Sequence, residues 1–494
     1  MDFKSTRGAG PVSGAQAIVD GIASDGGLYV PSEFPSITLD ELNDLSAFDY
    51  PERAALIMNK YLDEFTYEEL LEITKKAYSK FDSEYPNPLV KVEEGMYIME
   101  LWHGPTCAFK DMALTVLPYL LTECKKKLNE DKKTLILVAT SGDTGKAALE
   151  GFKDVEGTEI VCLYPSDGVS DMQKLQMITT EGNNTHVIGI TGNFDDAQNA
   201  VKKIFTSDEM KKKFNELGFD LSSANSINFG RLLPQIVYYI SSYVDLVVEE
   251  QINLGDEVNF VVPSGNFGNI LAAYYAKKMG LPIANLVVAS NKNNVLTEFF
   301  DEGVYDKNRE FYKTMSPSMD ILISSNLERL LYAIFDENSE KVSELMHELK
   351  DSGYYRIDED VLFDRAPEFF AYSSDEEETK ETICNFFDEY GYLLDPHTAV
   401  AVSAFFKFIN DIGDDKKTVI VSTANPYKFP QKVLECINET VEDDAQKAIK
   451  KLHMASAMDI PEGIKSLKDK EIRHTLVVDK DNIDEAVLSA VGGK

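Results

Sequence analysis

Short apolar runs alternate with helix-length segments through most of the chain. The runs that predict β-strands are residues 134–139, 159–163, 186–190, 259–263, 285–289 and 418–421. The segments that predict helices after the first four of these runs are 145–152, 172–180, 197–205 and a helix from Ile270. Strands that alternate with helices in this way are typical of a parallel sheet covered by helices. We therefore predict an α/β fold with parallel sheets flanked by helices.

Two stretches depart from this alternation. Residues 1–91 are rich in short amphipathic segments and predict an N-terminal helical domain. An acidic, helix-like stretch near 296–390 interrupts the strand pattern, which returns only after it. We interpret this stretch as an insertion into a single α/β core, residues 92–494, built from two subdomains. Its charge run at 374–378 has no metal-ligand spacing and is typical of a solvated surface.

The composition limits the class of function. The chain has 84 acidic against 49 basic residues, a formal charge of −35, with no basic stripe to offset it. Such a charge repels nucleic acid and anionic membranes, so we expect neither as a partner. The five cysteines are scattered without C-x-x-C spacing and predict neither a disulfide framework nor a zinc site. No apolar leader and no run of about 18 apolar residues occurs, so we expect a cytoplasmic protein.

Residues 103–111 (HGPTCAFKD) place Lys110 in a turn punctuated by glycine and proline, just before an apolar segment. A lysine amine condenses with an aldehyde when its pKa is lowered, and apolar neighbours such as Phe109 and Met112 favour the neutral amine. On this pattern alone, a solvated pair of Lys110 and Asp111 at a helix start remains open.

Two segments between a predicted strand and a predicted helix could bind anions. In residues 264–269 (SGNFGN), two glycines let the backbone and a helix N-terminus approach a phosphate, although a simple turn is the alternative. Residues 140–146 (TSGDTGK) end in Gly-Lys like a nucleotide-binding loop. They lack the first glycine of that motif and the Ser/Thr after its lysine. What remains is a hydroxyl-rich helix N-terminus, which suits a carboxylate.

The string HGPTCAFKDMA at 103–113 resembles the cofactor-lysine motif of the threonine synthases, a family of fold-type II pyridoxal phosphate enzymes with a tryptophan synthase β-like core. Further matches to this family occur in the same order at 5–8 (STRG), 140–148 (TSGDTGKAA), 223–231 (SANSINFGR), 264–269 (SGNFGN) and 422–424 (STA). The resemblance covers essentially the whole chain. It implies pyridoxal 5'-phosphate as the cofactor and no metal.

The resemblance implies that Lys110 bonds to the cofactor and is the catalytic residue. The cofactor-binding residues it implies are Lys110, Asp143, Gly265, Asn266, Phe267, Gly268, Asn269 and Thr423. The residues of 265–269 would hold the cofactor phosphate, and Thr423 would contact the pyridine nitrogen. Asp143 stands where many relatives have an asparagine against the phenolic oxygen, so one of these two groups must hold a proton. Asn425 replaces a histidine of the family pattern.

The resemblance also implies a substrate site with a second anion pocket. Its residues are Thr140, Ser141, Thr144, Asn225, Ser226 and Arg231. The first three would hold an α-carboxylate and the last three a phosphate, with Arg231 as a bidentate donor. On its residues alone, Arg231 could also be a surface arginine at a strand end. His103 and His397 lie near these motifs without a partner at recognisable spacing, and we assign them no catalytic role.

The implied activity is conversion of O-phospho-L-homoserine and water to L-threonine and phosphate. A related phospho-lyase, which releases 2-oxobutyrate and ammonia, shares the lysine and phosphate motifs and remains the alternative. A catalytically silent binding protein on the same fold is disfavoured by the intact Lys110 and both anion motifs. The family branch implies a monomer or small homo-oligomer, and we expect no regulation by S-adenosylmethionine.

Overall fold

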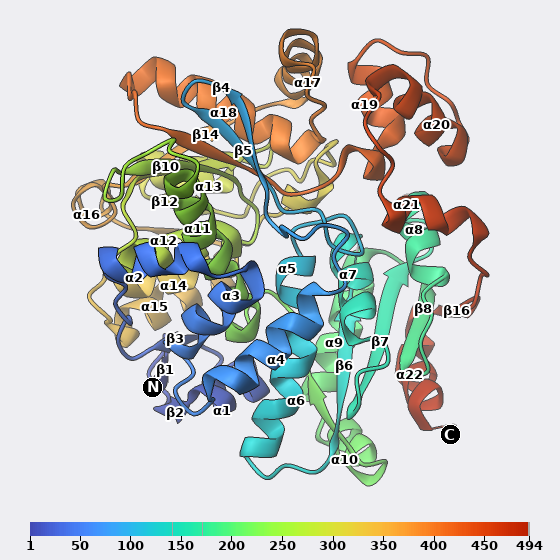
Figure 1. Cartoon of the computed structure of the whole chain (residues 1–494). Helices are drawn as coiled ribbons and strands as arrows, with labels where there is room; N and C mark the ends of the chain where they lie inside the picture. The colour runs from blue at the N-terminus through green and yellow to red at the C-terminus, as the bar shows by residue number, and fades with distance from the viewer. Residues whose placement is uncertain (141, 170, 493–494) are drawn as a thin grey trace.

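Two mainly parallel sheets form the centre of the computed structural model, which describes residues 1–140, 142–169 and 171–492 (Figure 1). Within these residues the larger sheet has six strands in the order β14-β11-β10-β15-β5-β4. They are β4 (Leu89–Glu93), β5 (Met96–Glu100), β10 (Val258–Pro263), β11 (Ile283–Ser290), β14 (Phe369–Ser373) and β15 (Thr418–Ser422). All neighbours pair in parallel except β4, which is antiparallel to β5.

The second sheet is parallel throughout and, in the described part of the chain, has the order β16-β8-β7-β6-β9. Its strands are β6 (Lys133–Ala139), β7 (Thr158–Pro165), β8 (Thr185–Thr191), β9 (Phe219–Ser222) and β16 (Val477–Asp479). All residues of β7 and β10 are buried, which explains their continuous apolar runs, because helices cover both faces of a parallel sheet. The predicted α/β fold is therefore confirmed.

Helices follow these strands as the alternation predicts. They are α5 (Asp111–Leu114), α6 (Leu117–Lys127), α7 (Asp143–Phe152), α8 (Asp171–Ile178), α9 (Phe194–Thr206), α10 (Asp208–Glu216), α11 (Phe229–Val248) and α12 (Gly268–Met279). The helix α5, which follows Lys110, lies between the two sheets (Figure 1). No helix among the described residues is long and apolar enough to span a bilayer.

The N-terminal region is not purely helical. A small antiparallel sheet of β1 (Asp2–Ser5), β2 (Val12–Ser13) and β3 (Tyr29–Pro31) accompanies α1 (Gly14–Asp20), α2 (Leu39–Asp44), α3 (Tyr50–Asn59) and α4 (Tyr67–Tyr78). Thr38, Asp49 and Thr66 each form a capping box with the glutamate three residues later, which sets the starts of α2, α3 and α4.

The acidic stretch at 296–390 is not wholly helical either, and the sheet resumes inside it. Its helices are α13 (Val295–Glu302), α14 (Leu327–Ile334), α15 (Ser339–Asp351), α16 (Glu359–Arg365) and α17 (Glu376–Tyr390), with the 3-10 turn η2 (Pro317–Met319) and an antiparallel pair of strands, β12 (Val304–Asp306) and β13 (Tyr354–Arg356). The strand β14 pairs in parallel with β11 at the sheet edge. Between 374 and 378, Asp375 and Glu378 form the capping box of α17.

The C-terminal region wraps back onto both sheets. Along the chain, this region contains α18 (Pro396–Ile412), the 3-10 turn η3 (Pro426–Lys428), α19 (Pro430–Cys436), α20 (Ala445–Ser456), α21 (Glu462–Lys465) and α22 (Ile483–Gly492). The short strand β16 adds to the edge of the second sheet beside β8, and α22 lies against the same sheet (Figure 1). The apolar pattern did not predict β16.

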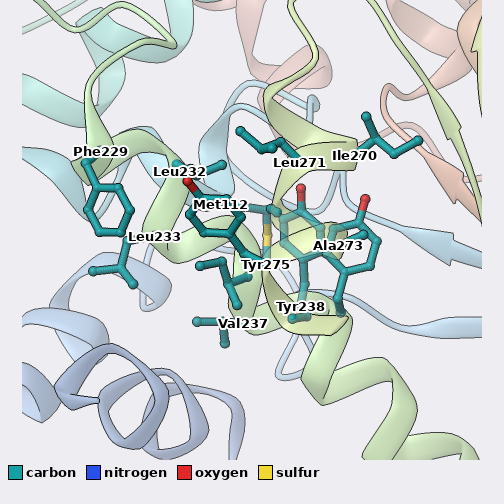
Figure 2. Packing of buried hydrophobic residues seen from close by; sticks show 14 of the residues in the cluster. Met112, Phe229, Leu232, Leu233, Val237, Tyr238, Ile270, Leu271, Ala273 and Tyr275 are labelled. Carbon is teal, nitrogen blue, oxygen red and sulfur yellow. The ribbon is translucent and has the colours of Figure 1, made fainter. Parts of the chain in front are cut away.

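The core between α11 and α12 fixes the region around Lys110. Figure 2 shows Leu232, Val237 and Tyr238 of α11 packed against Leu271 of α12, with Met112 of α5 among them. These side chains are fully buried. Met112 stands two residues after Lys110, so this packing holds the start of α5 in place.

Candidate active site

Lys110 lies directly before α5, where the segment after β5 meets the segment after β15. Ala108 and Ala424 form an isolated β-bridge, and Phe109 N donates a hydrogen bond to Thr423 O at 2.8 Å. The predicted turn with Lys110 ahead of an apolar helix is confirmed. Two motifs more than 300 residues apart in the sequence, those of Lys110 and Thr423, are therefore joined through backbone contacts.

The surroundings of Lys110 favour a neutral amine. Burial lowers the pKa of Lys110 to about 8, and the positive charges of Arg231 and Lys428 act in the same direction, while Asp143 and Asp111 oppose them. A lysine with a pKa near neutrality is suited to Schiff-base formation and to proton transfer. The solvated surface pair of Lys110 and Asp111 does not form, because Asp111 is fully buried and accepts hydrogen bonds from Thr106 N at 2.8 Å and Thr106 Oγ1 at 2.6 Å.

Asp143 forms a buried ion pair with Lys428, a residue that sequence reasoning missed. The Lys428 amine lies 3.1 Å from Asp143 Oδ1 and donates to Thr106 O at 2.8 Å. Burial alone would raise the pKa of Asp143, but the charges of Lys428 and Lys110 hold it below its ordinary value. Asp143 is therefore ionised. Lys428 stands in η3, five residues after Thr423, and no spacing rule marks it.

The hydroxyls at the end of β15 have different surroundings. Ser422 Oγ accepts a hydrogen bond from Trp102 Nε1 at 3.0 Å and contacts Thr398 Oγ1 at 3.0 Å. Thr423 is buried beside it, and its contact with the pyridine nitrogen stays a prediction. Asn425 is also buried, with Oδ1 accepting from Tyr427 N at 3.0 Å, so it caps η3.

The glycine loop between β10 and α12 packs closely against η2. A Cβ atom on Gly265 would lie 3.1 Å from Ser318 O and 3.3 Å from Met319 Cα, so a side chain there would displace η2. Phe267 has a left-handed backbone, φ 61°, as the loop turns into α12. Asn269 Oδ1 accepts hydrogen bonds from two tyrosines of α11.

The loop that begins α7 is organised by Thr140. Its Oγ1 accepts hydrogen bonds from Gly142 N and Gly145 N, both at 3.0 Å, and the residue is buried. Thr144 is half-buried on the first turn of α7. Ser141 lies outside the described residues. The roles of these residues toward a carboxylate stay predictions.

Arg231 is a buried residue of α11 rather than a surface arginine. Its Nη1 donates to Ala224 O at 2.6 Å, and burial lowers its pKa to about 10. The preceding loop is tied down by Arg329, whose Nη2 donates to Ile227 O at 2.7 Å. Asn225 is exposed and Ser226 half-buried in this loop. A phosphate role for these residues stays a prediction.

Four buried side-chain donors around these loops have no hydrogen-bond partner within the described chain: Gln176 Nε2, Arg231 Nε, Asn269 Nδ2 and Asn425 Nδ2. A buried donor left unsatisfied costs about 1–3 kcal/mol, so such groups are normally retained for a ligand or water. Unsatisfied donors at these positions fit a cofactor with anionic oxygens and an aldehyde.

The N-terminal motif at 5–7 serves a structural contact. Glu328 of α14 accepts hydrogen bonds from Thr6 Oγ1 at 2.6 Å and from Arg7 at 2.9 and 2.8 Å. Ser5 Oγ donates to Asp25 Oδ1 at 2.7 Å. The contacts of Thr6 and Arg7 fasten the N-terminal region to α14, that of Ser5 lies within the N-terminal region, and none of them reaches Lys110.

Three family models match the chain. They are "Threonine synthase N terminus" at residues 2–78, "Pyridoxal-phosphate dependent enzyme" at 81–424 and "Threonine synthase, C-terminal" at 398–487. The threonine synthase of Pseudomonas aeruginosa is 35% identical over 496 residues, which cover 100% of this chain and 99% of the relative. That of Saccharomyces cerevisiae is 38% identical over 460 residues, 87% of this chain and 88% of the relative.

Human threonine synthase-like 1 is 39% identical over 444 residues, 86% of this chain but 59% of the relative, so the chain spans about three fifths of that protein. Among solved structures, pyridoxal phosphate-bound threonine synthase from Brucella melitensis matches with a TM-score of 0.88 and 35% identity over 99% of both chains. Yeast threonine synthase matches with a TM-score of 0.90 and 33% identity over 100% of this chain and 99% of that one. The cofactor of this chain is pyridoxal 5'-phosphate.

Proposed function

Because the chain belongs to the threonine synthase family of pyridoxal phosphate-dependent enzymes, we propose that it converts O-phospho-L-homoserine and water to L-threonine and phosphate. The observation that carries the proposal is the buried Arg231, whose Nε has no partner within the described residues. A desolvated guanidinium with a free donor is suited to a phosphate on the substrate. It belongs to α11, a different element from the glycine loop that we assign to the cofactor phosphate.

The site residues have separate roles in the proposed reaction. Bound pyridoxal phosphate supplies the electron sink for the bonds to Cα and Cβ of the substrate. Lys110 removes the α-proton and then a β-proton, returns one proton at Cγ after phosphate leaves, and returns the other at Cα after water has added to Cβ. Arg231 holds the substrate phosphate, and the departing phosphate positions the water that adds to Cβ. The N-terminus of α7, shaped by Thr140, binds the α-carboxylate.

Thr423 contributes a neutral hydroxyl at the pyridine nitrogen. Such a group does not hold the ring protonated as a carboxylate would, which suits elimination and addition better than transamination. Asp143 would hold the phenolic oxygen of the cofactor, with its own charge balanced by Lys428.

The assay is incubation of the purified protein with pyridoxal phosphate and O-phospho-L-homoserine, with phosphate and threonine measured together. Equal amounts of the two products support the proposal. Phosphate accompanied by 2-oxobutyrate and ammonia, without threonine, would identify the phospho-lyase instead. Because the chain is similar to human threonine synthase-like 1, the assay also measures the products of this second activity.

A further inference from the structure

Ser318 lies in the turn η2 between the lysine and the carboxylate of the site. Its hydroxyl accepts a hydrogen bond from Lys110 Nζ at 3.4 Å and donates one to Asp143 Oδ2 at 3.3 Å. We propose that Ser318 is a catalytic residue, which fixes the direction of the Lys110 amine and links it to the negative charge of Asp143. The inference rests on the proposed function, because it takes Lys110 as the base.

Contacts on two sides fix the position of η2 and therefore that of the Ser318 hydroxyl. His397 Nε2 accepts a hydrogen bond from Ser318 N at 3.1 Å. The proton of the imidazole is therefore on Nδ1, which lies 2.7 Å from Asp395 Oδ1, and both side chains are buried. On the other side, the close approach of Gly265 to Ser318 O confines the turn. His397 and Asp395 are thus positioning residues; the sequence placed His397 near the motifs but did not identify Asp395 as its partner.

The charges around Lys110 determine where the proton lies in the hydrogen-bonded chain of Lys110, Ser318 and Asp143. Arg231 and Lys428 disfavour the ammonium form of Lys110, whereas Asp143 and Asp111 favour it. Asp143 has a pKa below its ordinary value and Lys110 a pKa of about 8, so the proton of the hydrogen-bonded chain stays on the lysine side. Ser318 therefore orients the Lys110 amine and couples it electrostatically to Asp143, and it transfers no proton.

Ser318→Ala tests the link through the reactivity of Lys110 itself. The full-length chain, freed of cofactor, is labelled with trace acetic anhydride between pH 6 and 10, and modification of Lys110 is quantified by mass spectrometry. Loss of a hydrogen bond to a charged group should lower the pH midpoint of labelling by roughly one unit. Ser318→Thr, which keeps the hydroxyl, should restore it. With cofactor bound, Ser318→Ala should lower kcat at least tenfold with little change in KM.

Ser316→Ala is the matched control, because Ser316 belongs to the same segment but its hydroxyl contacts Asn291 and Thr314 rather than Lys110. An unchanged midpoint in Ser318→Ala, or an equal shift in Ser316→Ala, would overturn the proposal. If the labelling midpoint shifts as expected but the native protein makes no threonine, the proposal for Ser318 holds and the proposed function is refuted instead.

Discussion

Replacing Lys428 with methionine removes the counter-charge of Asp143 while keeping most of the side-chain volume. The lysine amine makes contacts at 2.8 Å with Thr106 O, 3.1 Å with Asp143 and 3.4 Å with Gln176, and the side chains of Lys428 and Asp143 are only 1% and 3% exposed. Removing one partner of a buried pair leaves an uncompensated charge and costs about 3–5 kcal/mol. We expect Lys428→Met to lose stability on that scale at pH 7.

The loss should depend on pH in a definite direction. In the native protein the pKa of Asp143 lies below its ordinary value of 3.8, so its contribution to stability is complete above that value and is lost only as pH falls toward the folded one. Without Lys428, burial dominates and raises the pKa of Asp143. Acid then neutralises the buried carboxylate, so the deficit of the variant should be largest at neutral pH and shrink as the pH falls.

Urea midpoints of the cofactor-free protein at pH 5 and pH 8 measure both effects. Lys76→Met is the control, because Lys76 forms an exposed ion pair with Glu72 and should change the midpoint little at either pH. A Lys428→Met variant that unfolds like the native protein at pH 8, or that shows the same deficit at pH 5, would refute this account of the pair.

Three further changes test the assigned site residues. Lys110→Ala should abolish the borohydride trapping of cofactor on the chain while leaving the fold intact; a trapped peptide containing Lys146 would show that the wrong lysine has been chosen. Arg231→Ala should weaken substrate binding about ten- to a hundred-fold, measured as KM, with little change in cofactor affinity, and equal losses of both would contradict two separate anion sites. Thr423→Asp should raise the pKa of the pyridine nitrogen, slow threonine formation and add a long-lived visible absorbance band; unchanged turnover and spectrum would transfer the role to Ser422.

Hydrophobic alternation predicted β10, β11 and β15 of the larger sheet and β6, β7 and β8 of the second sheet, because these strands are mostly long and buried. Within these two sheets the strands β4, β5, β9, β14 and β16 were missed, and all of them except the short, buried β5 lie at a sheet edge. β14 lies at a sheet edge with most of its residues only partly buried, and β16 has three residues, two of them exposed. Edge strands carry little apolar signal, and their pairing depends on the rest of the fold.

Motif resemblance selected Lys110, Asp143 and Arg231, and the structure places Asp143 and Arg231 within electrostatic range of Lys110. It did not select Ser318 or Lys428. Ser318 contacts Lys110 across 208 positions of sequence and Lys428 contacts Thr106 across 322. Contacts of this kind are created by the topology, which brings η2 and η3 to the same end of the six-stranded sheet, and no local pattern encodes them.

Lys428 also determines whether Asp143 or the phenolic oxygen of the cofactor carries the proton. With Lys428 at Oδ1 and Ser318 at Oδ2, the carboxylate stays ionised, so a hydrogen bond to the phenolic oxygen of the cofactor requires the proton on that oxygen. An asparagine at 143 would leave Lys428 as an unpaired buried cation. The two residues should therefore be coupled: Asp143→Asn and Lys428→Met should each destabilise the protein, and the double variant should lose less than the sum by at least about 1 kcal/mol in urea unfolding. Additive losses would mean that Thr106 and Gln176 alone satisfy Lys428 and that Asp143 is held by other groups.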